Sequence, residues 1–188
     1  MAKHRLFLGV DPSAKNLESL VKFQEEIRGS FRTKNCRWSP KSSIHLTLHF
    51  LGAVEEEKIA VLIEKMKVVE KEKAVDETLN TFVAFPHMES ARVAGIGTAA
   101  DLVPQSTSLH ETSKRVLEAL NIQVEPRKFR PHITLTRFSF PQDLRKLPYA
   151  NVEPIIFEIS ALNLYESHLE KSGSRYVVLN SFILTKSL

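Results

Sequence analysis

The sequence predicts an α+β protein with two pseudo-symmetric lobes, each an antiparallel sheet with helices outside, around a central cleft. Strand and helix patterns alternate along the chain, and a His-x-Thr-Leu pattern occurs once in each half, at residues 45–48 and 132–135. A length of 188 residues is enough to bury a substantial apolar core. No stretch rich in Pro, Gly or Ser separates the halves, so we expect one bilobal domain over residues 1–188.

Each element is expected from its local pattern. Residues 5–10 predict a strand, and Asp11 before Pro12 predicts the cap of a helix whose apolar residues recur at helical spacing until Gly29. A strand over about 44–51 ends at Gly52, and residues 55–69 predict an amphipathic helix. In the second half we expect a helix over about 105–120 and strands at about 78–85, 91–97, 127–138, 155–166 and 176–185.

The composition is that of an ordinary soluble globular protein, with 43% hydrophobic and 26% charged residues. A formal net charge of +4 is compatible with nucleic-acid binding but does not identify it. The single cysteine, Cys36, excludes an intramolecular disulfide and fits a reducing compartment. We expect no secretory leader and no membrane helix, because no apolar run approaches about 20 residues. A cytoplasmic protein that does not bind membranes is the resulting expectation.

The two His-x-Thr-Leu patterns are the main functional signal. On a strand, residues i and i+2 share a face, so His45 with Thr47, and His132 with Thr134, each present an imidazole and a hydroxyl together. If the two strands face each other, these side chains converge and supply two proton-transfer groups for chemistry on a phosphate ester. His49 shares the parity of His45 but lies about 13 Å further along a strand, so we expect a structural or peripheral role for it and not a catalytic one.

Acidic residues are absent around both motifs. None occurs between Glu26 and Glu55 or between Glu125 and Asp143, whereas basic residues are frequent in both stretches. Such stretches favour a positive field that suits an anionic substrate, although a solvated surface would show the same composition. The basic residues in question are Arg28, Arg32, Lys34, Arg37, Lys41, Arg127, Lys128, Arg130 and Arg137.

Two residues lie five positions after the histidines and are further candidates. In a regular strand Arg137 would leave the face of His132, but a bulge or the strand's end would let its guanidinium turn into the cleft and bind phosphate oxygens. Phe50 holds the corresponding place after His45. Its ring could stack on a nucleobase or fill an apolar core.

Other chemistries have weaker support in the sequence. His45 and His49 would stand one turn apart on a helix and could chelate zinc, but β-branched and aromatic neighbours favour a strand. Cys36 as a nucleophile has no accompanying signature. Gly95 and Gly97 lack the Gly and Lys of a phosphate-binding loop and are expected to close a strand. No carboxylate pair frames either motif, which disfavours a glycosidase or a two-metal nuclease. We expect neither a metal nor a cofactor.

Together these residues resemble the 2H phosphoesterase superfamily, and within it the RNA 2',3'-cyclic phosphodiesterase (2'-5' RNA ligase) family. The resemblance extends over residues 5–10, 37–52, 129–137 and 164–167 and the closing strand. It implies metal-independent hydrolysis of a terminal 2',3'-cyclic phosphate to a 2'-phosphate, possible reversible 2'-5' ligation, and RNA ends or nucleotides with such a phosphate as partners. We expect a monomer.

By position, the resemblance assigns His45 and His132 as acid-base residues, Thr47 and Thr134 as phosphate ligands, and Arg137 as an added phosphate contact. It also suggests His132 as the base that activates water and His45 as the acid that serves the leaving 3'-oxygen.

Two departures from the family concern substrate range. His49 stands where members often carry a lysine or arginine, and Ala94 stands where a larger residue is common before a turn at Gly95. Two other functions stay open: a non-catalytic nucleotide-binding module, and a phosphodiesterase that acts on 2'-5' oligoadenylate or ADP-ribose cyclic phosphate.

Overall fold

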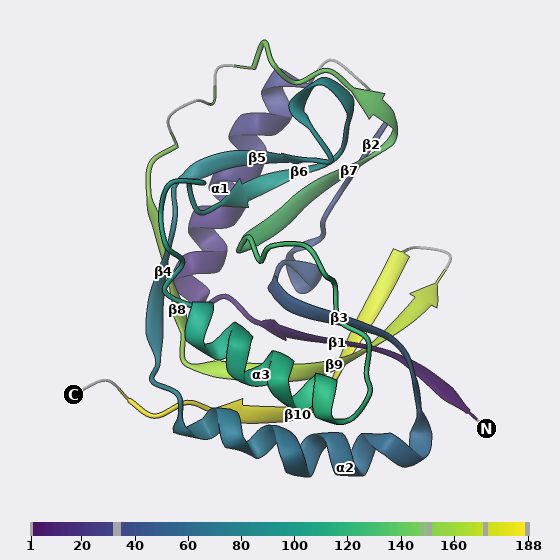
Figure 1. Cartoon of the computed structure of the whole chain (residues 1–188). Coiled ribbons are helices and arrows are strands. Elements are labelled where there is room, and N and C mark those ends of the chain that lie inside the picture. The colour runs from purple at the N-terminus through teal and green to yellow at the C-terminus, as the bar shows by residue number, and fades with distance from the viewer. Residues whose placement is uncertain (1, 32–34, 148, 150–151, 171–172, 187–188) are drawn as a thin grey trace.

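The computed structural model describes residues 2–31, 35–147, 149, 152–170 and 173–186 (Figure 1). The helices are α1 (Ala14–Ser30), α2 (Glu56–Met66) and α3 (Thr107–Ala119), with 3-10 turns η1 (Lys41–Ser43), η2 (Lys67–Lys71) and η3 (Met88–Ser90). The strands are β1 (Lys3–Val10), β2 (Cys36–Trp38), β3 (Leu46–Glu55), β4 (Val75–Leu79), β5 (Thr81–Phe85), β6 (Ala91–Gly97), β7 (His132–Gln142), β8 (Ile155–Ile159), β9 (Ala161–Glu170) and β10 (Gly173–Ile183). No helix of the described residues is long and apolar enough to cross a membrane.

One eight-stranded antiparallel sheet runs through the protein in the order β10-β9-β1-β3-β7-β6-β5, and β2 pairs with β7 off this path. We call β10, β9, β1 and β3 the first half-sheet, and β7, β6, β5 and β2 the second half-sheet. The second lies above the first in Figure 1. Among the described residues one pair, Leu46 with Ile133, joins β3 to β7. The predicted α+β class with antiparallel sheets is confirmed.

Helices α1 and α3 each pack on the half-sheet that does not contain the strand preceding them. Helix α1 follows β1, yet it packs on the second half-sheet, where Gln24 Nε2 donates to the carbonyl oxygen of Leu135 at 3.0 Å. Helix α3 follows β6, yet its Ser113 Oγ lies 3.0 Å from His49 Nε2 of β3. Strands β9 and β10 also return to the first half-sheet. The half-sheets therefore do not correspond to the two halves of the sequence.

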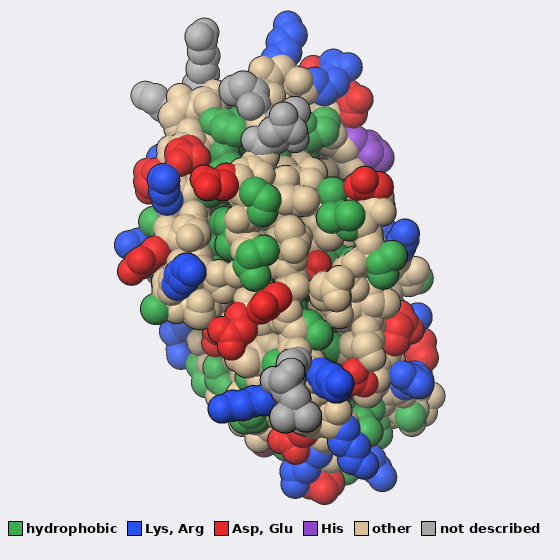
Figure 2. Space-filling model, turned by 90° about the vertical axis from the view of Figure 1, so that its left-hand side faces the viewer, with side chains coloured by type: hydrophobic (Ala, Val, Ile, Leu, Met, Phe, Trp, Pro, Cys, Tyr) green, Lys and Arg blue, Asp and Glu red, His purple; other side chains and the backbone are tan. Residues whose placement is uncertain are grey.

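Two predicted long strands are each broken in two. The stretch expected at 78–85 is β4 and β5, separated at Asn80, and the stretch expected at 155–166 is β8 and β9, separated at Ser160. Strand β4 pairs with β8 in a separate two-stranded sheet, which runs along the left side of Figure 1 between the half-sheets. Uninterrupted strands were a wrong prediction, because the chain changes sheets at both points. On this side acidic and basic side chains are interspersed (Figure 2).

Helix α1 begins at Ala14, and its N-cap is Ser13 instead of Asp11. The Ser13 hydroxyl accepts the N–H of Asn16 at 3.2 Å. The Asp11 carboxylate accepts Nδ2 of Asn163 on β9 at 3.1 Å. The predicted cap was therefore wrong, because a tertiary partner occupies the carboxylate.

The other predicted elements are present with shifted ends. The strand expected at 44–51 continues to Glu55, and the helix expected at 55–69 is α2 followed by the 3-10 turn η2. The strand expected at 127–138 begins only at His132, and β10 begins at Gly173, before the expected residue 176. The turn expected at 170–174 includes residues 171 and 172, which lie outside the described residues.

His49 lies in the core and is 3% exposed. Its Nε2 is 3.1 Å from the carbonyl oxygen of His110, which only accepts, so Nε2 carries a proton. The ring of His49 stacks on His110 with centroids 4.2 Å apart, and His110 stacks on Phe129 at 4.1 Å. These stacked rings connect β3, α3 and the segment that leads to the second motif.

Protonation of His49 should cost stability in acid. Desolvation, with the neighbouring His110 as a smaller cause, lowers the pKa of His49 to about 4. An unfolded chain has a histidine pKa of about 6.5, so below that pH it binds more protons than the native state. The free energy of unfolding should therefore fall as the pH drops from 6.5 to 4, by at most about 3 kcal/mol from this group. Urea unfolding at several pH values measures the slope.

A His49→Gln variant provides the control for this slope. Glutamine keeps a donor for Ser113 but does not titrate, so the variant should show a shallower pH dependence even if it is less stable overall. An identical slope in both proteins would contradict the assignment to His49.

Candidate active site

The Leu46–Ile133 pair brings the two motifs together on one face of the sheet. Both of these side chains are fully buried in the core, so their neighbours on each strand point the other way. We call this opposite side the site face. It carries four half-buried side chains: His45, Thr47, His132 and Thr134. The antiparallel register sets His45 toward Thr134 and Thr47 toward His132.

Each histidine is oriented by the same contact. Nδ1 of His45 lies 2.8 Å from the carbonyl oxygen of Ser43, and Nδ1 of His132 lies 2.8 Å from that of Arg130. A carbonyl oxygen only accepts, so Nδ1 carries a proton in both rings. Nε2 is therefore the nitrogen of each ring that is left to exchange a proton with a ligand.

Burial lowers the pKa of both histidines, and the surrounding charges act differently on the two rings. Asp11 acts to raise the pKa of His45, whereas arginines act to lower that of His132. Arg137 also acts to lower the pKa of His45. These charges favour a proton on His45 over one on His132. The arginines that act on His132 are Arg137, Arg130 and Arg127.

Aromatic rings lie around His45 and help to bury it. Phe7 lies 4.9 Å from the His45 ring, and Tyr176 contacts it edge-on at 5.1 Å. Tyr165 stacks on Phe7 at 4.6 Å. These residues come from β1, β9 and β10, and no local pattern distinguishes them from other strand aromatics, so sequence patterns did not identify them.

A bulge in β7 decides the direction of Arg137. Residues 94 and 95 of β6 pair with residues 136 and 134 of β7, which leaves Leu135 as an extra residue. The alternation reverses there: Leu135 and Thr136 are both buried, and Arg137 is exposed on the site face. The structure thus contains the bulge on which a cleft-facing Arg137 depended.

Strand β3 has the same irregularity after its own motif. Residues 8 and 9 of β1 pair with residues 49 and 47, which leaves Leu48 as the extra residue. His49 consequently turns into the core, and Phe50, 57% exposed, joins the site face with its ring 6.3 Å from Phe7. The expectation that His49 shares the face of His45 was wrong because of this bulge.

The bulge in β7 is held by hydrogen bonds from two other elements. The carbonyl oxygen of Leu135 accepts the Ser39 N–H at 2.9 Å and Gln24 Nε2 at 3.0 Å. Ser39 Oγ donates to the carbonyl oxygen of Thr134 at 2.9 Å. Gln24 is buried at 4% exposure in helix α1. These two polar residues, which sequence patterns did not identify, fix the backbone between Thr134 and Arg137.

Not all residues of the acid-poor stretches reach the site face. Arg28 pairs with Glu25 at 3.4 Å and lies over the Trp38 ring at 5.0 Å. Arg32 and Lys34 lie outside the described residues. The basic composition of the first stretch therefore overstates the charge that acts at the motifs.

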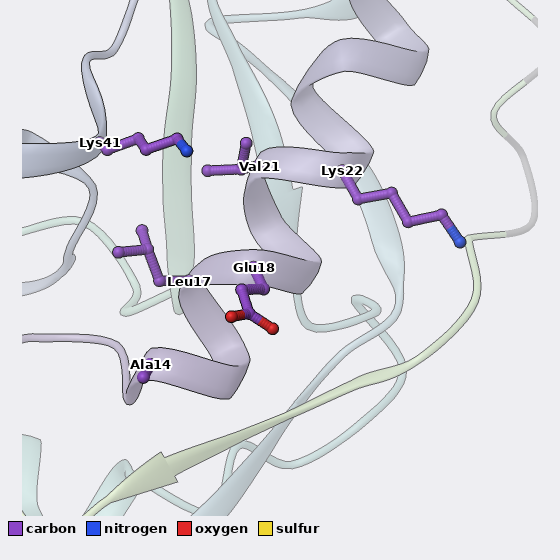
Figure 3. A pocket seen from close by; sticks show the side chains of 6 residues that line it. All are labelled: Ala14, Leu17, Glu18, Val21, Lys22 and Lys41. Atoms are coloured by element: carbon purple, nitrogen blue, oxygen red, sulfur yellow. The ribbon is translucent and has the colours of Figure 1, made fainter.

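Lys41 lies in a surface hollow beside helix α1, where it extends toward Val21 above Leu17 (Figure 3). This hollow has a volume of about 410 Å³ and contains neither motif histidine. Cys36 packs against the core. In the part of the chain that the structure describes, no three residues among His, Cys, Asp and Glu are grouped so as to hold a metal ion.

The chain matches a known family of phosphoesterases. The profile of the protein family described as LigT like Phosphoesterase matches residues 10–94 and 96–176. The chain therefore belongs to this family of 2H phosphoesterases.

Curated relatives resemble the chain over most of its length. The RNA 2',3'-cyclic phosphodiesterase of Methanocaldococcus jannaschii is 30% identical over 185 residues, which cover 95% of this chain and 99% of the relative. The protein of the same name from Thermus thermophilus is 30% identical over 190 residues and covers 96% of this chain and 90% of its own.

Solved structures share the fold. E. coli LigT in its apo form has a TM-score of 0.79 at 23% identity, with 98% of this chain and 99% of that chain covered. TT0787 of Thermus thermophilus has a TM-score of 0.75 at 27% identity, with 96% and 97% covered. The likeness extends over nearly the whole chain and includes both half-sheets.

Gly95 lets β6 approach the second motif closely. It lies inside β6, so the turn expected there is wrong, and a Cβ on it would lie 1.9 Å from the carbonyl oxygen of Ile133. Gly95→Ala should push β6 away from Thr134, destabilise the protein by about 1–3 kcal/mol and lower phosphodiesterase turnover. Thermal unfolding and an activity assay measure the two effects.

Gly29→Ala is the matched control for that substitution. No atom lies within 4 Å of a Cβ at Gly29 in helix α1, and alanine is favoured there by about 0.5–1 kcal/mol. The control should keep full activity with equal or higher Tm. A Gly95→Ala protein as stable and active as the control would refute the close approach.

Proposed function

We propose that this protein hydrolyses 2',3'-cyclic phosphates, at RNA ends or on nucleotides, to 2'-phosphates by acid-base catalysis with His45 and His132. The main support for this proposal is that the half-buried imidazoles of His45 and His132 lie on the site face, each with Nδ1 bound to a backbone carbonyl oxygen. The names of the curated relatives support the substrate class. In this proposal the whole chain acts as one bilobal domain, without a metal.

The proposed reaction needs one neutral and one protonated imidazole. His132 Nε2 takes a proton from water, the water oxygen attacks phosphorus, and the bond from phosphorus to the 3'-oxygen breaks. His45 Nε2–H gives its proton to the 3'-oxygen, and the phosphate stays on the 2'-oxygen. Asp11, which acts to raise the pKa of His45, and the arginines that act to lower the pKa of His132 support these roles.

The remaining side chains of the site face would hold the substrate. The hydroxyls of Thr47 and Thr134 and the guanidinium of Arg137 bind the non-bridging phosphate oxygens and stabilise the charge that builds on them. Phe50, exposed on the same face, stacks on the nucleobase. If an RNA 5'-hydroxyl replaces water, the same steps form a 2'-5' linkage, so the site would also support reversible ligation.

The alternative functions differ in which substrates the protein would hydrolyse. A nucleotide-binding module would bind a cyclic mononucleotide without hydrolysing it. An enzyme for 2'-5' oligoadenylate or ADP-ribose cyclic phosphate would turn those substrates over in preference to RNA that ends in a cyclic phosphate. A side-by-side product assay with these substrates decides among the functions.

Replacement of either His45 or His132 by Ala should lower turnover of a 2',3'-cyclic nucleotide by about 10²- to 10⁴-fold, because each removes one proton-transfer group. The double variant should be little worse than the poorer single variant. The assay is run with and without EDTA, and activity should persist in the chelator. His87→Ala, at an exposed histidine, is the control. Near-normal turnover in either single variant, or a loss that added zinc restores, would overturn the mechanism.

The proposed proton roles predict that a substrate with a better leaving group restores turnover unequally in the two histidine variants. An analogue whose leaving group is an aryl oxide needs little help from an acid, so it should restore turnover in His45→Ala far more than in His132→Ala. Single-turnover rates for both variants with both substrates measure the rescue. Rescue in the opposite order would exchange the roles of the two histidines and leave the rest of the mechanism in place.

A further inference from the structure

Two arginines face each other directly on neighbouring strands of the second half-sheet. Arg37 of β2 pairs with Arg137 of β7, so their side chains leave the sheet on the same side. Both are exposed, whereas Cys36 and Trp38, on either side of Arg37, pack against the core. Arg37 therefore lies on the site face, one strand beyond Arg137.

Neither arginine belongs to an ion pair found among the described residues. Some other exposed arginines have carboxylate partners, such as Arg145, 2.6 Å from Asp143, and Arg127, 2.9 Å from Glu125. Further arginines are also exposed without a partner among these ion pairs, but none of them is paired directly with a second arginine across the described sheet: Arg5, Arg92, Arg115 and Arg130. Directly opposed like charges on a sheet are destabilising. An anion bound between the two guanidinium groups would remove this repulsion and gain charge-assisted hydrogen bonds.

Strand β10 contacts both Arg37 and the reacting centre. The Tyr176 ring contacts the His45 ring at 5.1 Å, and a Cβ on Gly173 would lie 3.9 Å from Arg37 Nη1. These two positions are three residues apart on one strand, which is about 10 Å. Arg37 therefore contacts the same strand that His45 contacts, about three residues further along it. Arg137 is among the charges that act most on the pKa of both histidines, whereas Arg37 is not, so we place Arg37 beyond the phosphate that the histidines hold.

We propose that Arg37, beside Arg137, forms a second anion subsite that binds the 5'-phosphate of the nucleoside carrying the reacting phosphate. In RNA this group is the phosphodiester to the preceding nucleotide. The subsite rests on the proposed function for its orientation, since the reacting phosphate is placed at His45 and His132. The subsite would favour ligands whose terminal ribose carries a 5'-phosphate in addition to the 2',3'-cyclic phosphate. Nucleosides that carry the cyclic phosphate alone would bind more weakly.

Binding of two product-like ligands tests this subsite without any turnover. Adenosine 2'-monophosphate carries only the phosphate for the histidines, and adenosine 2',5'-bisphosphate carries the second phosphate as well. Calorimetry should show about tenfold tighter binding of the bisphosphate by the unaltered protein. Arg37→Gln should abolish most of that preference, and Arg37→Lys should keep part of it, since lysine retains the charge but not the planar fork.

Arg145→Gln is the control, because it removes the same charge at a site paired with Asp143 and should keep the tenfold preference. The Tm of Arg37→Gln should not fall, since the substitution relieves the repulsion of two like charges. The subsite is refuted if the unaltered protein shows no preference, if Arg37→Gln retains it, or if Arg37→Gln weakens both ligands equally.

A turnover experiment separates this inference from the proposed function. The unaltered protein is assayed on adenosine 2',3'-cyclic phosphate with and without a 5'-phosphate, and the 5'-phosphate should lower KM more in the unaltered protein than in Arg37→Gln. Absence of turnover of both compounds would overturn the proposed function. The binding preference and its dependence on Arg37 would still decide the subsite.

Discussion

The backbone pairing of Leu46 with Ile133 is the constraint from which the geometry of the site follows. It joins the two half-sheets, and both side chains are fully buried. Burial of side chains of this size stabilises the fold by about 1.5–3 kcal/mol each. Because alternate residues of a strand face opposite sides, fixing these two in the core fixes His45 and His132 on the other side. The buried apolar pair thus positions the polar groups that we propose for catalysis.

The two motif strands have a β-bulge at the same place and differ in the side chains that follow it. In both, an extra leucine after the threonine reverses the alternation, so that the next residue enters the core and the one after it reaches the site face. The core position is His49 in one strand and Thr136 in the other. The site-face position is Phe50 in one and Arg137 in the other. A symmetric backbone therefore presents an aromatic surface at one end of the site and a cation at the other.

The two half-sheets are connected by helices α1 and α3, which pack on the half-sheet opposite the strand before them, and by the separate β4–β8 sheet. Glu77 on β4 is fully buried, and its carboxylate accepts hydrogen bonds from Thr98 Oγ1 at 2.8 Å and Ser106 Oγ at 2.6 Å. These contacts link β4, the end of β6 and the start of α3. With α1 covering the second half-sheet and α3 covering the first, neither half of the sequence holds a half-sheet together with its covering helix. The spacing between the two motifs is therefore set by contacts throughout the chain.

The sequence by itself determined the α+β class, the helices, strand β6 to the residue, both motif strands and the family. Period-2 and period-3.6 patterns depend only on near neighbours, and the two motifs are local. Tertiary structure decided which way Arg137, His49 and Phe50 point, because a bulge is a shift in register against a partner strand that the local pattern does not contain. It also decided the partner of Asp11 and the breaks at Asn80 and Ser160, since a distant strand or a second sheet competes there with the local preference.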